Sequence, residues 1–155
     1  MRFNVCFEDV VRSKEFQDFT ATLYPHGITY MSHTVCAPNG EAKSFYSDIN
    51  WGRHFIEQEY IKHDAVMNHS FNTNTLFIPW KSVGLTQAQR LIYNVRENDF
   101  KKYNGITISF RQNRHHHIIG LSTDTKSYNL PGYCFKNPQV LMDLMNLFKN
   151  SYAKS

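Results

Sequence analysis

YSDINWGRHFIEQEYIKHDAVMNHSFNTNTLFIPW, residues 46–80, is the stretch around which the rest of the chain is organised. Trp51 and Phe55 are four residues apart, and Tyr60 follows near the same side, so on a helix their rings share one face. The spacing predicts a helix over about 48–60. Its aromatic face is apolar enough to form part of a core or the wall of a cavity.

One carboxylate, Asp64, follows this helix and precedes Trp80, so that an acid stands between the two tryptophans of the chain. Pockets for small molecules combine apolar walls with a few convergent polar groups, and this stretch has both. A purely structural interpretation is also open. In that case the rings are ordinary core residues and Asp64 caps a short helix over about 64–71. Spacing alone favours the structural interpretation.

A wider combination of residues points to a family. Its members are two tryptophans, an acid, a run of aromatic and apolar positions, and two glycine-containing strands: Trp51, Phe55, Tyr60, Asp64, Val66, Phe77 to Trp80, Gly105-Ile106-Thr107 and Gly120-Leu121-Ser122-Thr123. Together they resemble the autoinducer-binding domain of LuxR-type quorum-sensing transcription factors. The resemblance covers roughly residues 46–123, and no single position would suffice for it.

The resemblance implies a PAS/GAF-like α/β/α sandwich and a buried pocket for an N-acyl-homoserine lactone or a similar small apolar signal. By the family pattern Asp64 accepts the ligand amide N–H, Trp51 donates to the lactone carbonyl, and Trp80 packs on the ring. A hydrogen bond to a charged group contributes about 1.5–3 kcal/mol. The full set of ligand-binding residues implied is Trp51, Asp64, Trp80, Tyr46, Ser47, Phe55, Tyr60, Val66, Phe77, Gly105, Thr107 and Thr123.

Some of these assignments stay open at the level of sequence. Tyr46 and Ser47 compete for one register, that of the family's donor to the acyl carbonyl. Thr123 matches a hydroxyl position, but threonine is also simply a good strand former. Two departures, Ala65 where the family usually has proline and Phe55 where it often has tyrosine, suggest a shifted ligand preference.

The order of elements agrees with that fold. Hydrophobic periodicity and turn signals predict an antiparallel sheet of five strands covered by helices on both faces. Thr86 and Gln89 form a capping box, from which a helix should run to about Lys102 with Ala88, Leu91, Ile92 and Val95 inward. The expected helices are 8–23, 48–60, 64–71, 86–102 and one from 137; the expected strands are 27–36, 42–46, 76–78, 105–110 and 116–123.

Composition bounds the functional class. The 155 residues, 41% hydrophobic, predict one folded domain over 1–155. No apolar run approaches the roughly 18 residues of a spanning helix, which predicts a cytoplasmic location away from membranes. The three cysteines are far apart and offer neither a disulfide framework nor a zinc knuckle, and we expect no cofactor. The net charge of +4 is scattered, with its densest cluster at Lys101-Lys102, so we expect no DNA binding by this chain alone.

The family also suggests partners. LuxR-type regulators continue into a helix-turn-helix domain, and we expect none in this chain. The expected partners are a small-molecule autoinducer and either a second copy or a LuxR-type regulator in a dimer. Alternatively, the chain is a dimerisation partner that lacks a DNA-binding domain and antagonises a full-length regulator.

An enzyme is the remaining alternative. His54, His63-Asp64, His69 and either Asp99 or Asp124 are similar to the metal ligands of HD phosphohydrolases, but those enzymes are all-helical. His115, His116 and His117 are expected to form a solvated hairpin shoulder, because neighbours on a strand point to opposite faces. No nucleophile elbow or phosphate-binding loop occurs. The sequence therefore predicts a ligand sensor that catalyses no reaction.

Overall fold

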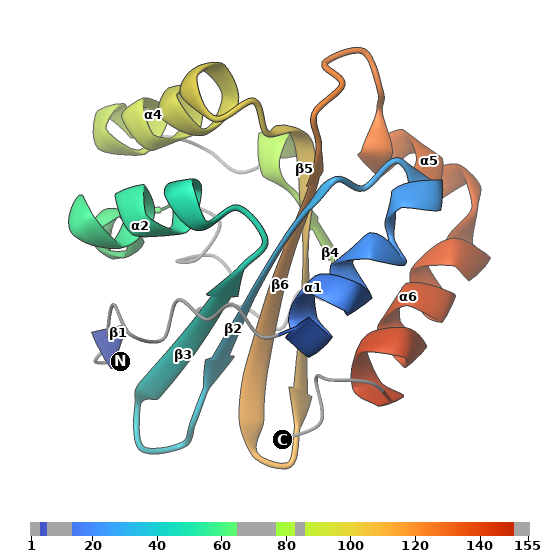
Figure 1. Cartoon of the computed structure of the whole chain (residues 1–155), viewed down its shortest axis with the longest axis horizontal. Helices are drawn as coiled ribbons and strands as arrows, with labels where there is room; N and C mark the ends of the chain where they lie inside the picture. Colours follow the sequence, from blue (N-terminus) through green and yellow to red (C-terminus); the bar gives the residue numbers. More distant parts are fainter. Residues whose placement is uncertain (1–3, 6–13, 65–76, 83–85, 151–155) are drawn as a thin grey trace.

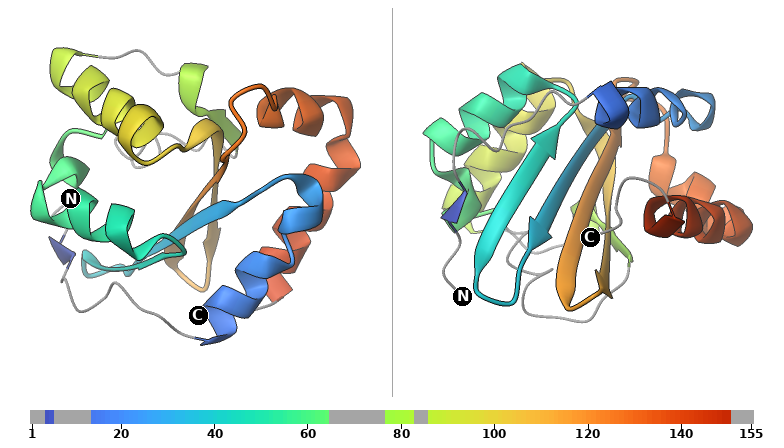
Figure 2. Two further views of the ribbon diagram at one scale, coloured as in Figure 1. Left: turned by 45° about the horizontal axis from the view of Figure 1, so that its top comes forward. Right: turned by 60° about the horizontal axis from the view of Figure 1, so that its bottom comes forward.

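The computed structural model describes residues 4–5, 14–64, 77–82 and 86–150. A sheet forms the middle layer, and helices cover both of its faces (Figures 1 and 2). On one side lie α1 (Lys14–Ala21), α5 (Leu130–Lys136) and α6 (Pro138–Asn150), and on the other lie α2 (Ile49–Glu57) and α4 (Gln87–Asn94). The predicted α/β/α sandwich is confirmed. Within the described residues, short 3-10 turns lie between the elements: η2 (Tyr24–His26), η3 (Tyr60–Lys62) and η4 (Trp80–Ser82).

The sheet has the strand order β1-β3-β2-β6-β5-β4. The five predicted antiparallel strands are present as β2 (Tyr30–Cys36), β3 (Glu41–Tyr46), β4 (Phe77–Pro79), β5 (Tyr103–Gln112) and β6 (His115–Thr123). A two-residue strand, β1 (Asn4–Val5), adds a parallel edge beside β3 that the sequence did not predict. In the part of the chain described, no helix is both long and apolar enough to cross a membrane.

The two faces of the sheet carry different cores, because successive side chains of a strand alternate between faces. Under α1, α5 and α6 the buried side chains are mainly aliphatic and phenylalanine, including Met31, Ile108 and Ile119. Under α2 and α4 the cluster is mainly aromatic, with Tyr30, Tyr46, Trp51, Phe55 and Trp80 packed beside Ile92. Four aromatic residues of the 46–80 stretch, Tyr46, Trp51, Phe55 and Trp80, therefore pack on one face of the sheet.

The helix after the capping box differs from expectation. Thr86 and Gln89 form the predicted box, but α4 ends at Asn94 and continues as a π-helix, η5 (Val95–Asp99). Its inward residues are Ile92 and Arg96, whereas Ala88 and Leu91 are exposed, Leu91 by 59%. The prediction for Ala88 and Leu91 was wrong. The buried face of this helix runs through Ile92 and Arg96, and a search for apolar periodicity does not count an arginine as a buried position.

Two further local differences concern the β5–β6 hairpin and the C-terminal helices. His116 and His117 are buried, so the predicted solvated shoulder is wrong there: His117 pairs with His33 and His116 bonds Ser109. Helix α5 was not predicted; it begins after Asn129, whose side chain accepts a hydrogen bond from the Gly132 N–H. The helix expected at 64–71 lies outside the described residues apart from its first position.

Candidate functional site: a cavity under the aromatic helix

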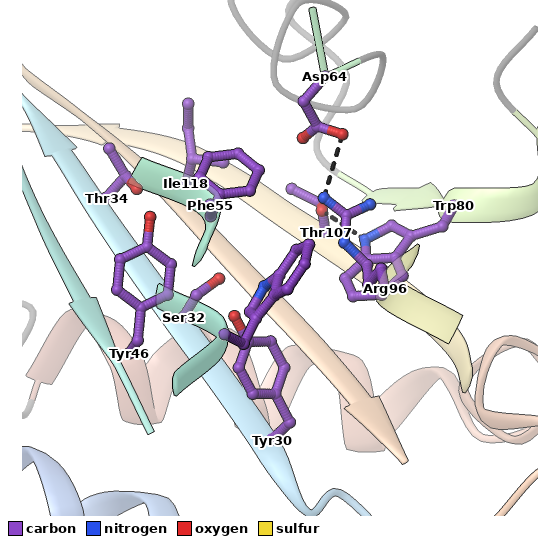
Figure 3. A pocket seen from close by; sticks show the side chains of 12 residues that line it. Tyr30, Ser32, Thr34, Tyr46, Phe55, Asp64, Trp80, Arg96, Thr107 and Ile118 are labelled. Carbon is purple, nitrogen blue, oxygen red and sulfur yellow. Dashed lines mark hydrogen bonds and ion pairs between the residues drawn. The ribbon is translucent and has the colours of Figure 1, made fainter. Parts of the chain in front are cut away.

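A cavity of about 40 Å³ lies between the sheet and the layer formed by α2, α4 and η5 (Figure 3). Strands β2, β3, β5 and β6 supply its floor, and the helices and the Asp64 and Trp80 turns supply its roof. The lining residues are Tyr30, Ser32, Thr34, Tyr46, Trp51, Phe55, Asp64, Trp80, Arg96, Thr107, Ile118 and Gly120.

The floor of the cavity is one row of neighbours across four strands. Ser32 stands opposite both Tyr46 and Gly120, and Gly120 stands opposite Thr107. The row dips at Gly120, where an added Cβ would lie 2.7 Å from Ser32 Oγ and 3.6 Å from the Trp80 ring. Glycine at this position therefore leaves space above the centre of the sheet.

Trp51 forms part of the roof and is fixed by the start of α2. The Asp48 carboxylate accepts the backbone N–H groups of Asn50 and Trp51 at 3.1 and 3.2 Å, which is the usual N-cap interaction. Its second oxygen accepts from Lys102 Nζ at 2.6 Å. The indole ring then packs at 5.6 Å from the Phe55 ring, centroid to centroid. Local helix capping thus sets where the first tryptophan stands.

Trp80 closes the other end of the cavity. Its indole Nε1–H donates to Thr107 Oγ1 at 2.9 Å, so this donor is already used inside the protein. The ring lies directly on Gly105, where a Cβ would collide with three of its carbons. Gly105 therefore allows the close approach of the second tryptophan to strand β5.

Between the two indoles lies a buried ion pair. Arg96 Nη2 donates to Asp64 Oδ1 at 3.1 Å, and the two side chains are only 8% and 6% exposed. The guanidinium carbon is 4.8 Å from the centroid of the Trp80 ring and 5.3 Å from that of Trp51. Figure 3 shows the Arg96 side chain beside Trp80 with its bond to Asp64. A cation thus occupies the polar end of an otherwise aromatic cavity.

Two tyrosines, Tyr30 and Tyr46, also line the cavity. Burial raises the pKa of Tyr30 and of Tyr46 well above the ordinary value of a phenol. Each can donate or accept a hydrogen bond at neutral pH. No histidine, cysteine or lysine is among the lining residues that the structure describes, and these residues offer no nucleophile paired with a base.

Six of the residues expected to bind the ligand come together around this cavity: Tyr46, Trp51, Phe55, Asp64, Trp80 and Thr107. Tyr46 and Ser47, which compete for one register in the sequence, have different surroundings in the structure. Tyr46 faces the cavity, whereas the Ser47 hydroxyl accepts the Met31 N–H at 2.9 Å. Whether the six contact a ligand stays a prediction.

The other expected residues lie elsewhere. Tyr60 packs behind Trp51 and bonds His54 at 3.2 Å, and Phe77 packs against the opposite core. Gly105 supports Trp80 from below without lining the cavity, and Thr123 Oγ1 accepts the Thr125 N–H at 3.2 Å. Val66 lies outside the described residues. Strand alternation and turn hydrogen bonds, which the spacing does not reveal, account for these placements.

Sequence reasoning missed six lining residues: Tyr30, Ser32, Thr34, Arg96, Ile118 and Gly120. Five of them lie on β2 and β6. Side chains alternate between the two faces of a strand, so once one residue of a strand faces the cavity the residues two positions away are expected to face it too. Arg96 had one usable signal. It lies four residues after the buried Ile92, which places a charged residue on the inward face of a helix.

A metal centre has no support in the described parts of the chain, which contain no group of three His, Cys, Asp or Glu side chains placed to hold an ion. His54 bonds Tyr60, and Asp64 bonds Arg96. The fold around them contains a central sheet, unlike the all-helical HD enzymes.

Comparison with known proteins bears on the fold. No protein-family model matches the sequence, and no curated protein matches it either. Three similar solved structures are those of Escherichia coli SdiA, of the N-acylhomoserine lactone dependent LuxR family transcription factor CepR2 from Burkholderia cenocepacia, and of SdiA in complex with octanoyl-rac-glycerol. Their TM-scores are 0.60, 0.71 and 0.56, with sequence identities of 14%, 11% and 14%.

The matches cover 94%, 94% and 91% of this chain, and 66%, 90% and 62% of the respective structures. The chain thus spans about two thirds of the length of SdiA. Its fold is that of the ligand-binding domain of LuxR-family proteins, as the resemblance implied. At these identities the likeness shows the fold alone.

Proposed function

We propose that this chain is a ligand-sensing domain that binds an acyl-homoserine lactone, or a similar small molecule with an apolar tail, in the cavity under α2 and α4. The observation that carries the proposal is the polar end of that cavity. Two indoles flank the buried Asp64–Arg96 pair, while Tyr46, Phe55 and Ile118 offer an aromatic and aliphatic wall. A few polar groups in apolar walls are what fixes the orientation of an amphipathic ligand.

The neighbours in fold support the ligand class. CepR2 is described as N-acylhomoserine lactone dependent, and SdiA has been solved with octanoyl-rac-glycerol. Both compounds join an acyl chain to a compact oxygen-bearing head. The cavity here holds about 40 Å³, against roughly 300–1,000 Å³ for typical ligand sites. Ligand entry therefore requires the roof to move away from the sheet.

A thermal-shift series tests the proposal. The purified chain is titrated with acyl-homoserine lactones of increasing chain length, and binding to the folded state should raise Tm by mass action. In Gly120→Val the new side chain points toward Ser32 and Trp80 and fills the cavity floor, so the shift should vanish. Leu91→Ala, at an exposed site on α4, serves as the matched control and should keep it. A Tm that no lactone changes would refute the proposal for this ligand class.

The same domain should perform no chemistry on its ligand, because the described lining residues provide no nucleophile paired with a base. Mass spectrometry of lactone recovered after incubation should show ring and amide intact. Turnover at an enzymic rate would refute this. A stoichiometric divalent ion in purified protein would instead favour the phosphohydrolase alternative.

The output of the sensor is proposed to pass through another protein, as a dimer with a second copy or with a LuxR-type regulator. The scattered positive charge gives no stripe for tracking DNA phosphates. Size measurement of co-expressed chains should show a mixed dimer, and reporter output of the full-length partner should fall. A discrete, salt-resistant complex of this chain alone with one DNA sequence would contradict it.

A further inference from the structure

We propose that Arg96 determines the head group that this cavity accepts, and that the preferred ligand is a neutral acyl compound whose head offers hydrogen-bond acceptors only, such as an acyl ester of a lactone. The amide N–H of an acyl-homoserine lactone is then dispensable. The inference rests on the proposed sensing function and narrows its ligand class.

The first step is that the carboxylate is already engaged. Asp64 Oδ1 accepts from Arg96 Nη2 at 3.1 Å in a site where both side chains are nearly inaccessible. A ligand N–H that displaced Arg96 would leave a buried charge without its partner, which is strongly unfavourable. Arg96 therefore already holds one of the two oxygens of Asp64, and a ligand amide gains less from this acid than it would from an unpaired one.

The second step is that Arg96 carries more N–H donors than its bond to Asp64 uses. A guanidinium carries five N–H donors in a planar fork. Its bond to Asp64 is the one hydrogen bond that joins it to another side chain among the described residues. Trp51 adds an indole N–H, which can only donate, and Tyr46 adds a hydroxyl. A carbonyl or ester oxygen placed beside Arg96 would use these donors and leave the ion pair intact.

The third step is the charge balance. The charges of Asp64 and Arg96 cancel each other. Next to Tyr30 the charges of Asp48 and Lys102 also cancel, and Lys102 Nζ lies 2.6 Å from the Asp48 carboxylate. A ligand carboxylate would bring a further negative charge, without a counter-charge of its own, into a dry site. Burying such a charge is costly. A neutral, acceptor-rich head satisfies Arg96 without this cost.

Three probes with one octanoyl chain separate these possibilities. They are N-octanoyl homoserine lactone, its ester isostere α-octanoyloxy-γ-butyrolactone, and the ring-opened carboxylate N-octanoyl homoserine. Calorimetry measures each affinity for the wild type, for Asp64→Asn and for Arg96→Met. A hydrogen bond from the ligand amide to ionised Asp64 would favour the amide over the ester by about 10- to 150-fold.

We expect an amide-to-ester ratio below about tenfold in the wild type, an unchanged ratio in Asp64→Asn, and weakest binding of the carboxylate. Arg96→Met should weaken amide and ester together by about tenfold or more. If a variant does not fold, the amide-to-ester affinity ratio of the wild type alone tests the inference. An amide preference of about tenfold or more, or tightest binding of the carboxylate, overturns this inference while the sensing function stands. Binding of none of the three overturns both.

Discussion

Arg96 Nη2 and Asp64 Oδ1 are 3.1 Å apart across 32 residues of sequence, and both side chains lie under the roof of the cavity. Arg96 reaches this position from the π-helix that follows α4. Insertions of this kind within helices are rare and often occur at functional sites. The pair joins the turn after η3 to η5 and places one cation between two tryptophan rings.

Removing one partner of this pair should be costly. Arg96→Met leaves the Asp64 carboxyl group in a dry site without its cationic partner, and we expect a loss of about 3–5 kcal/mol in the free energy of unfolding. The double variant Arg96→Met with Asp64→Leu removes both charges and should recover most of that loss. Urea denaturation monitored by circular dichroism measures all three proteins. A single variant within about 1 kcal/mol of the wild type would show that the pair is not formed in solution.

The sequence predicted the layers of the fold and half of the cavity wall for a physical reason. The capping box at Thr86 and Pro138 at the first position of α6 act locally, so nearby residues suffice to locate these two helices. Trp51, Asp64 and Trp80 were found together because each is chemically distinctive.

What could not be predicted depends on contacts distant in the sequence. The Arg96–Asp64 pair and the His33–His117 pair join residues 32 and 84 positions apart. No local pattern encodes such a partner. Thr123 and Ser47 look equally suitable as ligand donors until their hydrogen bonds to the backbone are seen. The roles of these polar residues could therefore be assigned only from their hydrogen bonds in the folded structure.

Gly105 is predicted to be essential for the position of Trp80. In Gly105→Ala the new Cβ would collide with the indole, so the ring must move and its hydrogen bond to Thr107 must stretch or break. We expect a loss of about 1–3 kcal/mol in stability. In a Trp51→Phe background Trp80 is the remaining tryptophan, and its emission should shift to the red as the ring becomes more exposed. An unshifted spectrum with wild-type stability would contradict this close contact.

The buried histidine pair predicts how stability depends on pH. His33 Nε2 and His117 Nδ1 are 2.9 Å apart, and each ring is 1% exposed. Burial lowers the pKa of His33 to about 3 and that of His117 to about 4. In the unfolded chain both rings titrate near about 6.5, so below that pH the unfolded state binds more protons. Stability should therefore fall as pH drops from about 6.5 towards about 4.

At pH 5 the loss should be about 2 kcal/mol for each ring, since the unfolded pKa lies about 1.5 units above that pH. Denaturation at pH 7 and at pH 5 measures it. A double variant, His33→Gln with His117→Gln, should lose less stability between the two pH values than the wild type. His63→Gln, at an exposed residue, is the matched control. Equal pH dependence in wild type and double variant would exclude the pair as the cause.

Asp48 links the start of α2 to Lys102, and two substitutions separate its roles. Asp48→Asn can keep the hydrogen bonds to the Asn50 and Trp51 N–H groups but loses the charge that pairs with buried Lys102. We expect it to cost about 1–2 kcal/mol, and Asp48→Ala about 1 kcal/mol more because the cap is also lost. Equal losses in the two variants would mean that capping contributes nothing.

The charge of Asp48 should also be visible in the pH dependence. Burial alone would raise its pKa, but the hydrogen bond and positive charge of Lys102, with the two backbone N–H groups, outweigh burial and hold the pKa below its ordinary value. Its contribution is therefore complete above about pH 4, the unfolded value, and is lost as pH falls through the lower folded pKa. The stability difference between wild type and Asp48→Asn should shrink over that acid range. In a Lys102→Met background the difference should be smaller, because the hydrogen bond and charge of Lys102 no longer lower the pKa of Asp48. A difference that instead persists unchanged to pH 2 in the wild-type background would show that the carboxylate does not act through its charge.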